Sequence, residues 1–338
     1  MIKGAVIGFG RMGITHFSIL NTHPAVSMVG VCDPSSFVVR AFERHTSVRG
    51  FTDSRRLFDS AALDFVVIAT PTSSHHELVK QALARGVHVF VEKPLTLHGL
   101  DSQQIVEDSG RSGLVNQVGY VNRFNEVFLA AKELLSAGVL GAVHHFRCAM
   151  YAPTVLRESR GGWRGERKTG GGCLLDFASH GIDLVQFMFG TPHHVAGSSM
   201  HSIHSRGADD AVYSNFLYRN GMSGHIAVNW SDGSYRKPAY RIEVEAANGR
   251  LGVDQHGYKL FLSREPQGSD YIAGWNVRAA TDLTRPVRFY LRGNEFTRQL
   301  DYFVERVASL DTTNINSFSS AAATDKLTQD ILDDAGVG

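Results

Sequence analysis

Four nearly continuous apolar runs in the first 120 residues constrain the fold more than any other feature of the chain. They are KGAVIGFG, VSMVGVCD, DFVVIATP and VHVFVEKP, and each ends in polar or turn residues. Such runs are typical of strands buried on both faces, because a half-exposed strand alternates apolar and polar side chains. Helical stretches such as SHHELVKQALARG separate them, and LVNQVGY at 114–120 is predicted as a last strand. This alternation predicts an α/β fold with a doubly wound parallel sheet of the Rossmann type.

The sequence pattern changes in the second part of the chain. From about residue 142, strands such as DAVYSNFLYRNG and AYRIEVEAANGRLGVDQHG alternate polar and apolar residues, with hairpin-type turns at Asn220-Gly221 and Asn248-Gly249. We expect an α+β domain with a large, open, mostly antiparallel sheet. A chain of 338 residues favours two domains, which we place at 1–121 and 122–338. The alternative for the last helices is that they pack back on the N-terminal domain.

The charge and the cysteine content of the chain exclude several classes of protein. The chain has 34 Lys plus Arg against 33 Asp plus Glu, a formal charge of +1, so nothing attracts it generally to nucleic acid or to a membrane surface. We found no signal-peptide pattern and no apolar run of membrane-spanning length. Cys32, Cys148 and Cys173 lie too far apart for a disulfide framework or a zinc pattern, and no HExxH appears. We expect a soluble, cytoplasmic protein with buried thiols and no metal.

A glycine motif follows the first predicted strand and opens a helix. It is formed by Gly8, Phe9, Gly10, Arg11, Met12 and Gly13. Glycines there let a pyrophosphate approach the helix N-terminus. About 20 residues later Asp33 ends the next strand, where a carboxylate accepts from a ribose 2′-hydroxyl and repels a 2′-phosphate. NAD is therefore favoured over NADP, and a glycine-rich turn without a ligand is the alternative.

Two more motifs close predicted parallel strands, Ala69-Thr70-Pro71 and Glu92-Lys93-Pro94. Ligands bind at the carboxyl ends of the strands in such sheets. A lysine held between a carboxylate and a proline at that edge is a candidate proton carrier, and a surface ion pair is the alternative.

The stretch GGGCLLDFASHGIDL, residues 170–184, places Asp176, His180 and Asp183 in an apolar run. Wound as an α-helix, the three lie within roughly 60° of one another. So narrow a polar stripe predicts a mostly buried helix whose polar groups are paired or line a cavity.

The segment RESRGGWRGERK, residues 157–168, has a local excess of three positive charges. Its basic residues are Arg157, Arg160, Arg164, Arg167 and Lys168. Arginine suits phosphate or carboxylate, and Trp163 offers a face for stacking. We hypothesise that Arg164 and Trp163 bind an anionic, even nucleotide-linked, sugar; the alternative is a solvated basic loop.

Together EKP, TPTSSHHE, VGYVNRF and GGGCLLDFASHGID resemble the glucose-fructose oxidoreductase, inositol dehydrogenase and MocA (Gfo/Idh/MocA) family, in order from residue 1 to about 190. The resemblance implies an NAD-dependent oxidoreductase acting on CH–OH groups. It would transfer a hydride between the nicotinamide and a ring secondary alcohol or ketone of a sugar, nucleotide sugar or cyclitol.

The same resemblance implies roles for individual residues. Lys93 would lie beside the nicotinamide and the reacting hydroxyl, with a cis bond to Pro94. Asp176 and His180 match the family's D-x-x-x-H, in which the histidine exchanges the substrate proton and the acid orients the ligand or the lysine. Which of Lys93 and His180 is the principal acid/base is left open.

Other implied residues surround these. Thr70, Pro71 and His75 match a segment that runs along the cofactor, and Glu92 would contact its ribose region. Asn122 and Arg123 match a segment at the junction of the two domains, where they would bind substrate, whereas Asp183 is expected to be structural.

The resemblance also leaves two other functions open and implies an oligomer. The same fold suits a glycosidase that uses NAD transiently, or a non-catalytic sensor of NAD or sugar. We also expect a homodimer or homotetramer through the open sheet, because that face would otherwise expose apolar area.

Overall fold

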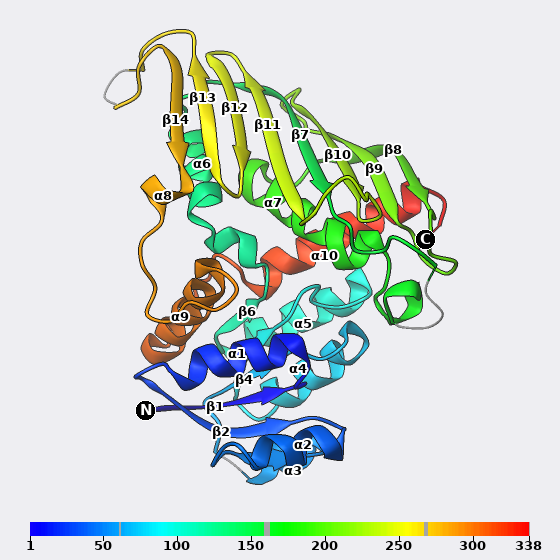
Figure 1. Cartoon of the computed structure of the whole chain (residues 1–338), viewed down its shortest axis with the longest axis vertical. Coiled ribbons are helices and arrows are strands. Elements are labelled where there is room, and N and C mark those ends of the chain that lie inside the picture. The colour runs from blue at the N-terminus through cyan, green and yellow to red at the C-terminus, as the bar shows by residue number, and fades with distance from the viewer. Residues whose placement is uncertain (61, 159–162, 267–269, 338) are drawn as a thin grey trace. The chain divides into compact units, whose positions relative to one another are not determined.

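A computed structural model describes the chain except for residues 61, 159–162, 267–269 and 338. The chain divides into two compact units (Figure 1). The first consists of Met1–Val121 and Pro286–Asp325, and the second of Asn122–Arg285 and Lys326–Gly338. Residues 286–325 therefore return to the first unit instead of staying with the second.

The first unit contains a six-stranded sheet in the order β3-β2-β1-β4-β5-β6, with every neighbouring pair parallel. Its strands are β1 (Ile2–Ile7), β2 (Val26–Cys32), β3 (Arg49–Phe51), β4 (Phe65–Ile68), β5 (His88–Val91) and β6 (Asn116–Val118). The predicted Rossmann-type sheet is confirmed, and the four apolar runs contain β2, β4 and β5 in full and β1 apart from Ile2. The strand order reverses between β1 and β4, which is where such sheets bind ligands.

Helices cover both faces of this sheet. They are α1 (Arg11–Asn21), α2 (Ser36–Glu43), α3 (Ser54–Ser60), α4 (His75–Leu83), α5 (Gly99–Ser112), α9 (Asn294–Ser309) and the first half of α10 (Phe318–Asp334). Alternate residues of β1 point to opposite cores: Ile7 belongs to the core that contains Val79 of α4, and Val6 to the core that contains Phe303 of α9. Burial on both sides explains why the strands are apolar throughout.

The second unit is built on an eight-stranded sheet in the order β14-β13-β12-β11-β7-β10-β9-β8. The strands are β7 (Val143–Tyr151), β8 (His194–His201), β9 (Ala211–Leu217), β10 (Ser223–Asn229), β11 (Ala239–Ala246), β12 (Gly249–Asp254), β13 (Gly257–Leu262) and β14 (Gly274–Ala279). All neighbours are antiparallel except β7 and β10. The mostly antiparallel sheet is confirmed.

One face of this sheet packs against α6 (Glu126–Ser136) and α7 (Ser179–Phe189), as Figure 1 shows, and a short helix, α8 (Ala280–Leu283), follows β14. The core includes Phe146 and Ile226 from the strands and Ile182 and Val185 from α7. Alternation places these apolar residues on the packed face.

The opposite face is polar at its centre. His145 and Arg147 of β7, His225 of β10 and Glu243 of β11 alternate with the buried residues of their strands. The same face also exposes Trp275 and Val277 of β14, and oligomerisation through it stays a prediction.

Two further expectations can be compared with the structure. Cys32, Cys148 and Cys173 are buried and unbridged, and burial raises the pKa of Cys32 and of Cys148 to about 12. Among the described residues, no helix combines the length and the apolar character needed to cross a membrane.

Candidate active site

The glycine motif forms the turn between β1 and α1. Gly8 has φ +88°, and a Cβ there would lie 2.7 Å from the backbone of Ala69. A Cβ on Gly13 would lie 1.8 Å from the carbonyl oxygen of Gly8, so only glycine lets the helix start so close to the turn. Gly10 precedes the first residue of α1, Arg11. The loop therefore brings backbone N–H groups at a helix N-terminus to the open end of the sheet, which suits a pyrophosphate.

Asp33 ties the end of β2 to this loop. Its Oδ2 accepts a hydrogen bond of 2.9 Å from the Phe9 N–H, and its Oδ1 accepts one of 2.9 Å from the Ser35 N–H. An ionised carboxylate has about four acceptor positions, so it can still accept from ribose hydroxyls. The loop and Asp33 together fit NAD.

His75 holds two strand ends together. Its ring is fully buried, with Nδ1 3.0 Å from the carbonyl oxygen of Pro94 and Nε2 3.0 Å from that of Thr70. Burial lowers its pKa, which the neighbouring carbonyls oppose but do not cancel. His75 thus lies between Thr70 and the Lys93-Pro94 bond, which is cis, and as a neutral ring it donates to one of the two carbonyls. Its predicted part in cofactor binding would act through these segments.

Glu92 lies directly after β5 and is held from two sides. The Nε2 of His16, on the inner face of α1, lies 2.6 Å from Oε1 of Glu92, and the Lys93 N–H donates to Oε2 at 3.2 Å. Burial alone would raise the pKa of Glu92, but the hydrogen bond and charge of His16 and the charge of Lys93 lower it overall. Glu92 is therefore an ionised carboxylate next to Lys93, as the order Glu92-Lys93 in the sequence predicts.

Our sequence analysis missed His16. Its signal was a histidine beside Thr15 among the otherwise apolar buried residues of α1, and this pattern gives no indication of its partner.

In the second unit, residues Cys173–Ala178 form a π-helix that continues into α7. The α-helical winding that we assumed for the polar stripe is therefore wrong before Ser179. π-Helical turns are rare and often mark functional sites. Asp176 lies on this turn, and its Oδ2 accepts a hydrogen bond of 3.0 Å from Nε of Arg164. His180, half-buried, follows in the first turn of α7.

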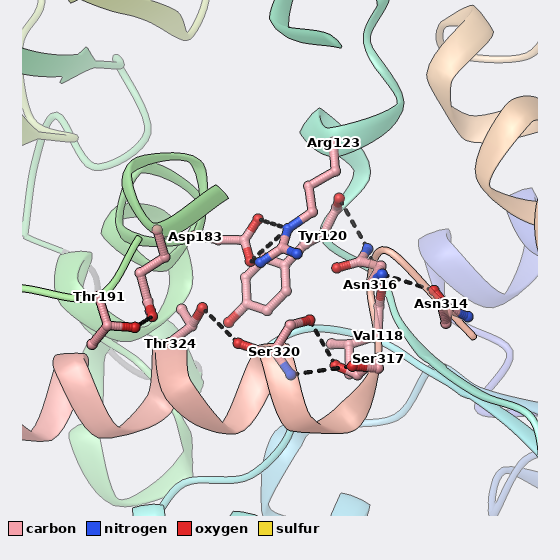
Figure 2. A network of polar contacts seen from close by, with 11 residues as sticks. Val118, Tyr120, Arg123, Asp183, Thr191, Asn314, Asn316, Ser317, Ser320 and Thr324 are labelled. Atoms are coloured by element: carbon pink, nitrogen blue, oxygen red, sulfur yellow. Dashed lines mark hydrogen bonds and ion pairs between the residues drawn. The ribbon is translucent and has the colours of Figure 1, made fainter. Parts of the chain in front are cut away.

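Asp183 is structural, as expected. It forms a buried, two-pronged ion pair with Arg123: Nη2 donates to Oδ1 at 2.7 Å and Nε to Oδ2 at 2.9 Å (Figure 2). Both side chains are at most 5% exposed, and Arg123 also lies over the ring of Phe187. The pair is thus buried inside the second unit, and the substrate contact predicted for Arg123 stays a prediction.

Tyr240, on β11, is a residue that we missed. Burial is the main reason that its pKa is raised; the charge of Asp176 raises it further, and Asn122 lowers it. Tyr240 lies on the same packed face of β11 as Ile242. The alternation of the strand predicts only that Tyr240 faces the core, and it does not indicate the neighbouring Asp176.

Two arginines of the basic segment form ion pairs with aspartates of the second unit. Arg164 pairs with Asp176, and Arg167 pairs with Asp209 at 3.3 Å. Arg160 and the side chain of Trp163 lie outside the described part of the structure. Among the residues described, no group of three or more His, Cys, Asp or Glu side chains is arranged to hold a metal ion.

Comparisons with known proteins agree with this architecture. Residues 2–120 match the model of an oxidoreductase family with an NAD-binding Rossmann fold, and residues 128–251 match the GFO/IDH/MocA C-terminal domain. The scyllo-inositol 2-dehydrogenase (NAD(+)) of Bacillus subtilis is 26% identical over 292 residues, which cover 82% of this chain and 81% of that one. The myo-inositol 2-dehydrogenase of Thermotoga maritima is 27% identical over 275 residues, covering 78% of each chain.

A solved structure shows the same fold over nearly the whole chain. Levoglucosan dehydrogenase in complex with NADH and levoglucosan superposes with a TM-score of 0.86 at 18% identity, covering 99% of this chain and 97% of that one. The two family models and this shared fold place the chain in one group: it belongs to the Gfo/Idh/MocA family of NAD-dependent oxidoreductases.

Proposed function

We propose that this protein is a dehydrogenase that interconverts a ring secondary alcohol and a ketone of a sugar, nucleotide sugar or cyclitol. The observation that carries the proposal is the ionised Glu92, held by His16 beside Lys93, in the same unit as the glycine loop. The names of the inositol dehydrogenases among its relatives support the cyclitol and sugar classes.

Several residues would hold the cofactor. The Gly8–Gly13 loop would bind the pyrophosphate, Asp33 the ribose of the adenosine half, and Thr70 and Pro71 would lie along it. NAD supplies a hydride acceptor when bound. The carboxylate of Asp33 favours NAD over NADP, because a 2′-phosphate would be repelled.

Oxidation of an alcohol also requires that the hydroxyl proton leave, so a base must lie within hydrogen-bond reach. We assign this base to His180, because histidine exchanges protons near neutral pH, and the stabilisation of the developing alkoxide to the Lys93 ammonium. Asp176 would orient the ligand. The family's sequence pattern supports this pairing of Lys93 with His180, and the exchange of their two roles is the alternative.

An absorbance screen at the NADH band tests the proposal. The protein is mixed with NAD or NADP and with scyllo-inositol, myo-inositol, levoglucosan, neutral sugars or nucleotide sugars. Net NADH formation with a polyol or sugar supports the dehydrogenase. Product release without net NADH would instead indicate a glycosidase that uses NAD transiently, and binding without turnover would indicate a sensor.

The same screen tests the anionic-sugar hypothesis. If Arg164 binds a phosphate or carboxylate, an Arg164→Ala variant loses affinity for a nucleotide sugar more than for an inositol. Equal affinity of the variant and the wild type for every nucleotide sugar would exclude that role.

A further inference from the structure

Asp209, in the loop before β9, lies against the start of the π-helix that carries Asp176. The side chain is buried, with 2% of the residue exposed. Its backbone carbonyl accepts a hydrogen bond of 2.8 Å from the Cys173 N–H, and its Oδ2 accepts one of 2.7 Å from the Leu174 N–H. The first N–H groups of a helix have no partner inside that helix, so Asp209 supplies partners from elsewhere in the chain.

The second oxygen of this carboxylate binds the basic segment. Nη2 of Arg167 donates to Oδ1 of Asp209 at 3.3 Å. A backbone bridge between Glu166 and Gly207 joins the same two stretches. We call Asp209, Arg167 and the N–H groups of Cys173 and Leu174 the clasp.

Gly172 shows that the backbone is shaped around this carboxylate. It has φ +103°, and a Cβ there would lie 2.7 Å from Oδ1 of Asp209. Any larger residue would have both an unfavourable backbone conformation and a clash with the carboxylate. Because Gly172, the third glycine of the GGG run, has no side chain, the Asp209 carboxylate can pack directly against its backbone.

The clasp is linked directly to Asp176. The Asp176 N–H donates to the carbonyl oxygen of Gly172 at 3.0 Å, and the Gly172 N–H donates to the carbonyl oxygen of Arg164 at 3.0 Å. The Arg164 side chain in turn holds Oδ2 of Asp176. A shift at Leu174 or Arg167 would thus move both the backbone and the side-chain support of Asp176.

We propose that Asp209 is a positioning residue for the dehydrogenase reaction: through Leu174 and Arg167 it fixes Asp176, and His180 one turn later. The inference rests on the proposed function. Burying a carboxylate is costly unless it is paired, and here the Leu174 N–H and the Arg167 guanidinium both donate to it, which opposes the rise in its pKa that burial causes. Two arginines of the basic segment, Arg164 and Arg167, thereby serve the placement of Asp176.

The test uses Asp209→Asn, which keeps the shape and removes the charge, and Arg167→Met, which removes the partner. Glu158→Gln is the matched control, because Glu158 forms an exposed ion pair with Arg206 in the same region. Amide hydrogen exchange is measured by mass spectrometry over residues 172–178. Affinity for NAD, and kcat, KM and their pH profiles with scyllo-inositol, are measured on the same samples.

We expect faster exchange over 172–178 and a lower kcat in both test variants, with NAD affinity unchanged. A misplacement of about 1 Å can cost about 100-fold in rate, so a fall of that order is expected for Asp209→Asn. The double variant should be no worse than the poorer single one, because both remove the same interaction. The pH profile of kcat should also shift, since the surroundings of Asp176 change.

Unchanged exchange over 172–178, or unchanged kcat and pH profile despite faster exchange, would overturn the inference. If Asp209→Asn does not fold, the same measurements on Arg167→Met test the inference. The Arg167 side chain is partly exposed, so we expect its replacement to leave the fold intact. If the wild type oxidises no polyol at all, the proposed function fails. In that case the exchange measurement still tests the clasp by itself.

Discussion

His16 and Glu92 lie 76 residues apart in sequence and 2.6 Å apart in the structure, measured from Nε2 to Oε1. The contact joins α1, the helix that the glycine loop opens, to the end of β5, where Lys93 follows. The His16 side chain is fully buried and that of Glu92 is 13% exposed, and the hydrogen bond between them is the largest of the influences that lower the pKa of Glu92 against the effect of burial. The cofactor loop and the lysine are thereby coupled through one buried hydrogen bond.

Replacing His16 should destabilise the first unit. His16→Leu leaves a buried carboxylate oxygen without its partner, which costs about 1–3 kcal/mol. Urea unfolding at pH 7 measures this loss. His16→Gln, which keeps a donor, should lose less, and His45→Gln, at an exposed histidine, should lose almost nothing. Equal stability of His16→Leu and the wild type would contradict this.

The pH dependence of that loss follows from the pKa of Glu92. The pKa is lowered in the folded protein, so the stabilisation is present above the ordinary value for glutamate, about 4.3, and is lost as the pH falls through the lower folded value. The difference in unfolding free energy between the wild type and His16→Leu should therefore shrink in acid. Urea titrations at several pH values check this, and a difference that grows in acid would refute it.

Asp33 should determine the choice between NAD and NADP. Asp33→Asn keeps the side-chain shape but removes the charge that would repel a 2′-phosphate. At 4 Å in water that repulsion is about 1 kcal/mol, or roughly a fivefold change in affinity. Binding of NAD and NADP by calorimetry should show NADP affinity rising relative to NAD. Asp59→Asn, at an exposed acid of the same unit, is the control. An unchanged NAD-to-NADP ratio in Asp33→Asn would exclude the role of Asp33.

The Arg123–Asp183 pair should contribute to stability rather than to substrate affinity. Asp183→Asn leaves a buried guanidinium without its counter-charge, at a cost of about 3–5 kcal/mol. Replacing both residues by apolar ones, as in Arg123→Met with Asp183→Leu, should recover much of that loss. Unfolding and KM measurements distinguish the roles: a large rise in KM with no loss of stability would support Arg123 as a substrate-binding residue.

The parts of the fold that the sequence predicted are those that local pattern determines. β1, β2, β4 and β5 are buried on both faces, so each reads as one apolar run, and the glycine turn is set by close backbone contacts at Gly8 and Gly13. The second sheet was predicted because only one of its faces is packed. In the structure His145 and Arg147 alternate with the buried residues of β7 and lie on its open face.

What the sequence did not predict depends on distant partners or on small changes of backbone geometry. His16 with Glu92, and Arg123 with Asp183, meet only once the chain has folded. The π-helix adds one residue per turn without changing the apolar character of Cys173–Ala178, so no periodicity signals it. Asp209 lies 33 residues after Asp176 in sequence, and only folding brings it to the start of that helix.

The most direct test mixes NAD-loaded protein with scyllo-inositol, or with the best substrate of the screen, and follows NADH absorbance in a single turnover. The wild type should give a stoichiometric rise in NADH. Lys93→Met should bind NAD equally well yet form NADH at least about 100-fold more slowly, because an acid/base or charge-stabilising group is lost. An undiminished rate of NADH formation in Lys93→Met would contradict the proposed role of Lys93 and, with it, the mechanism.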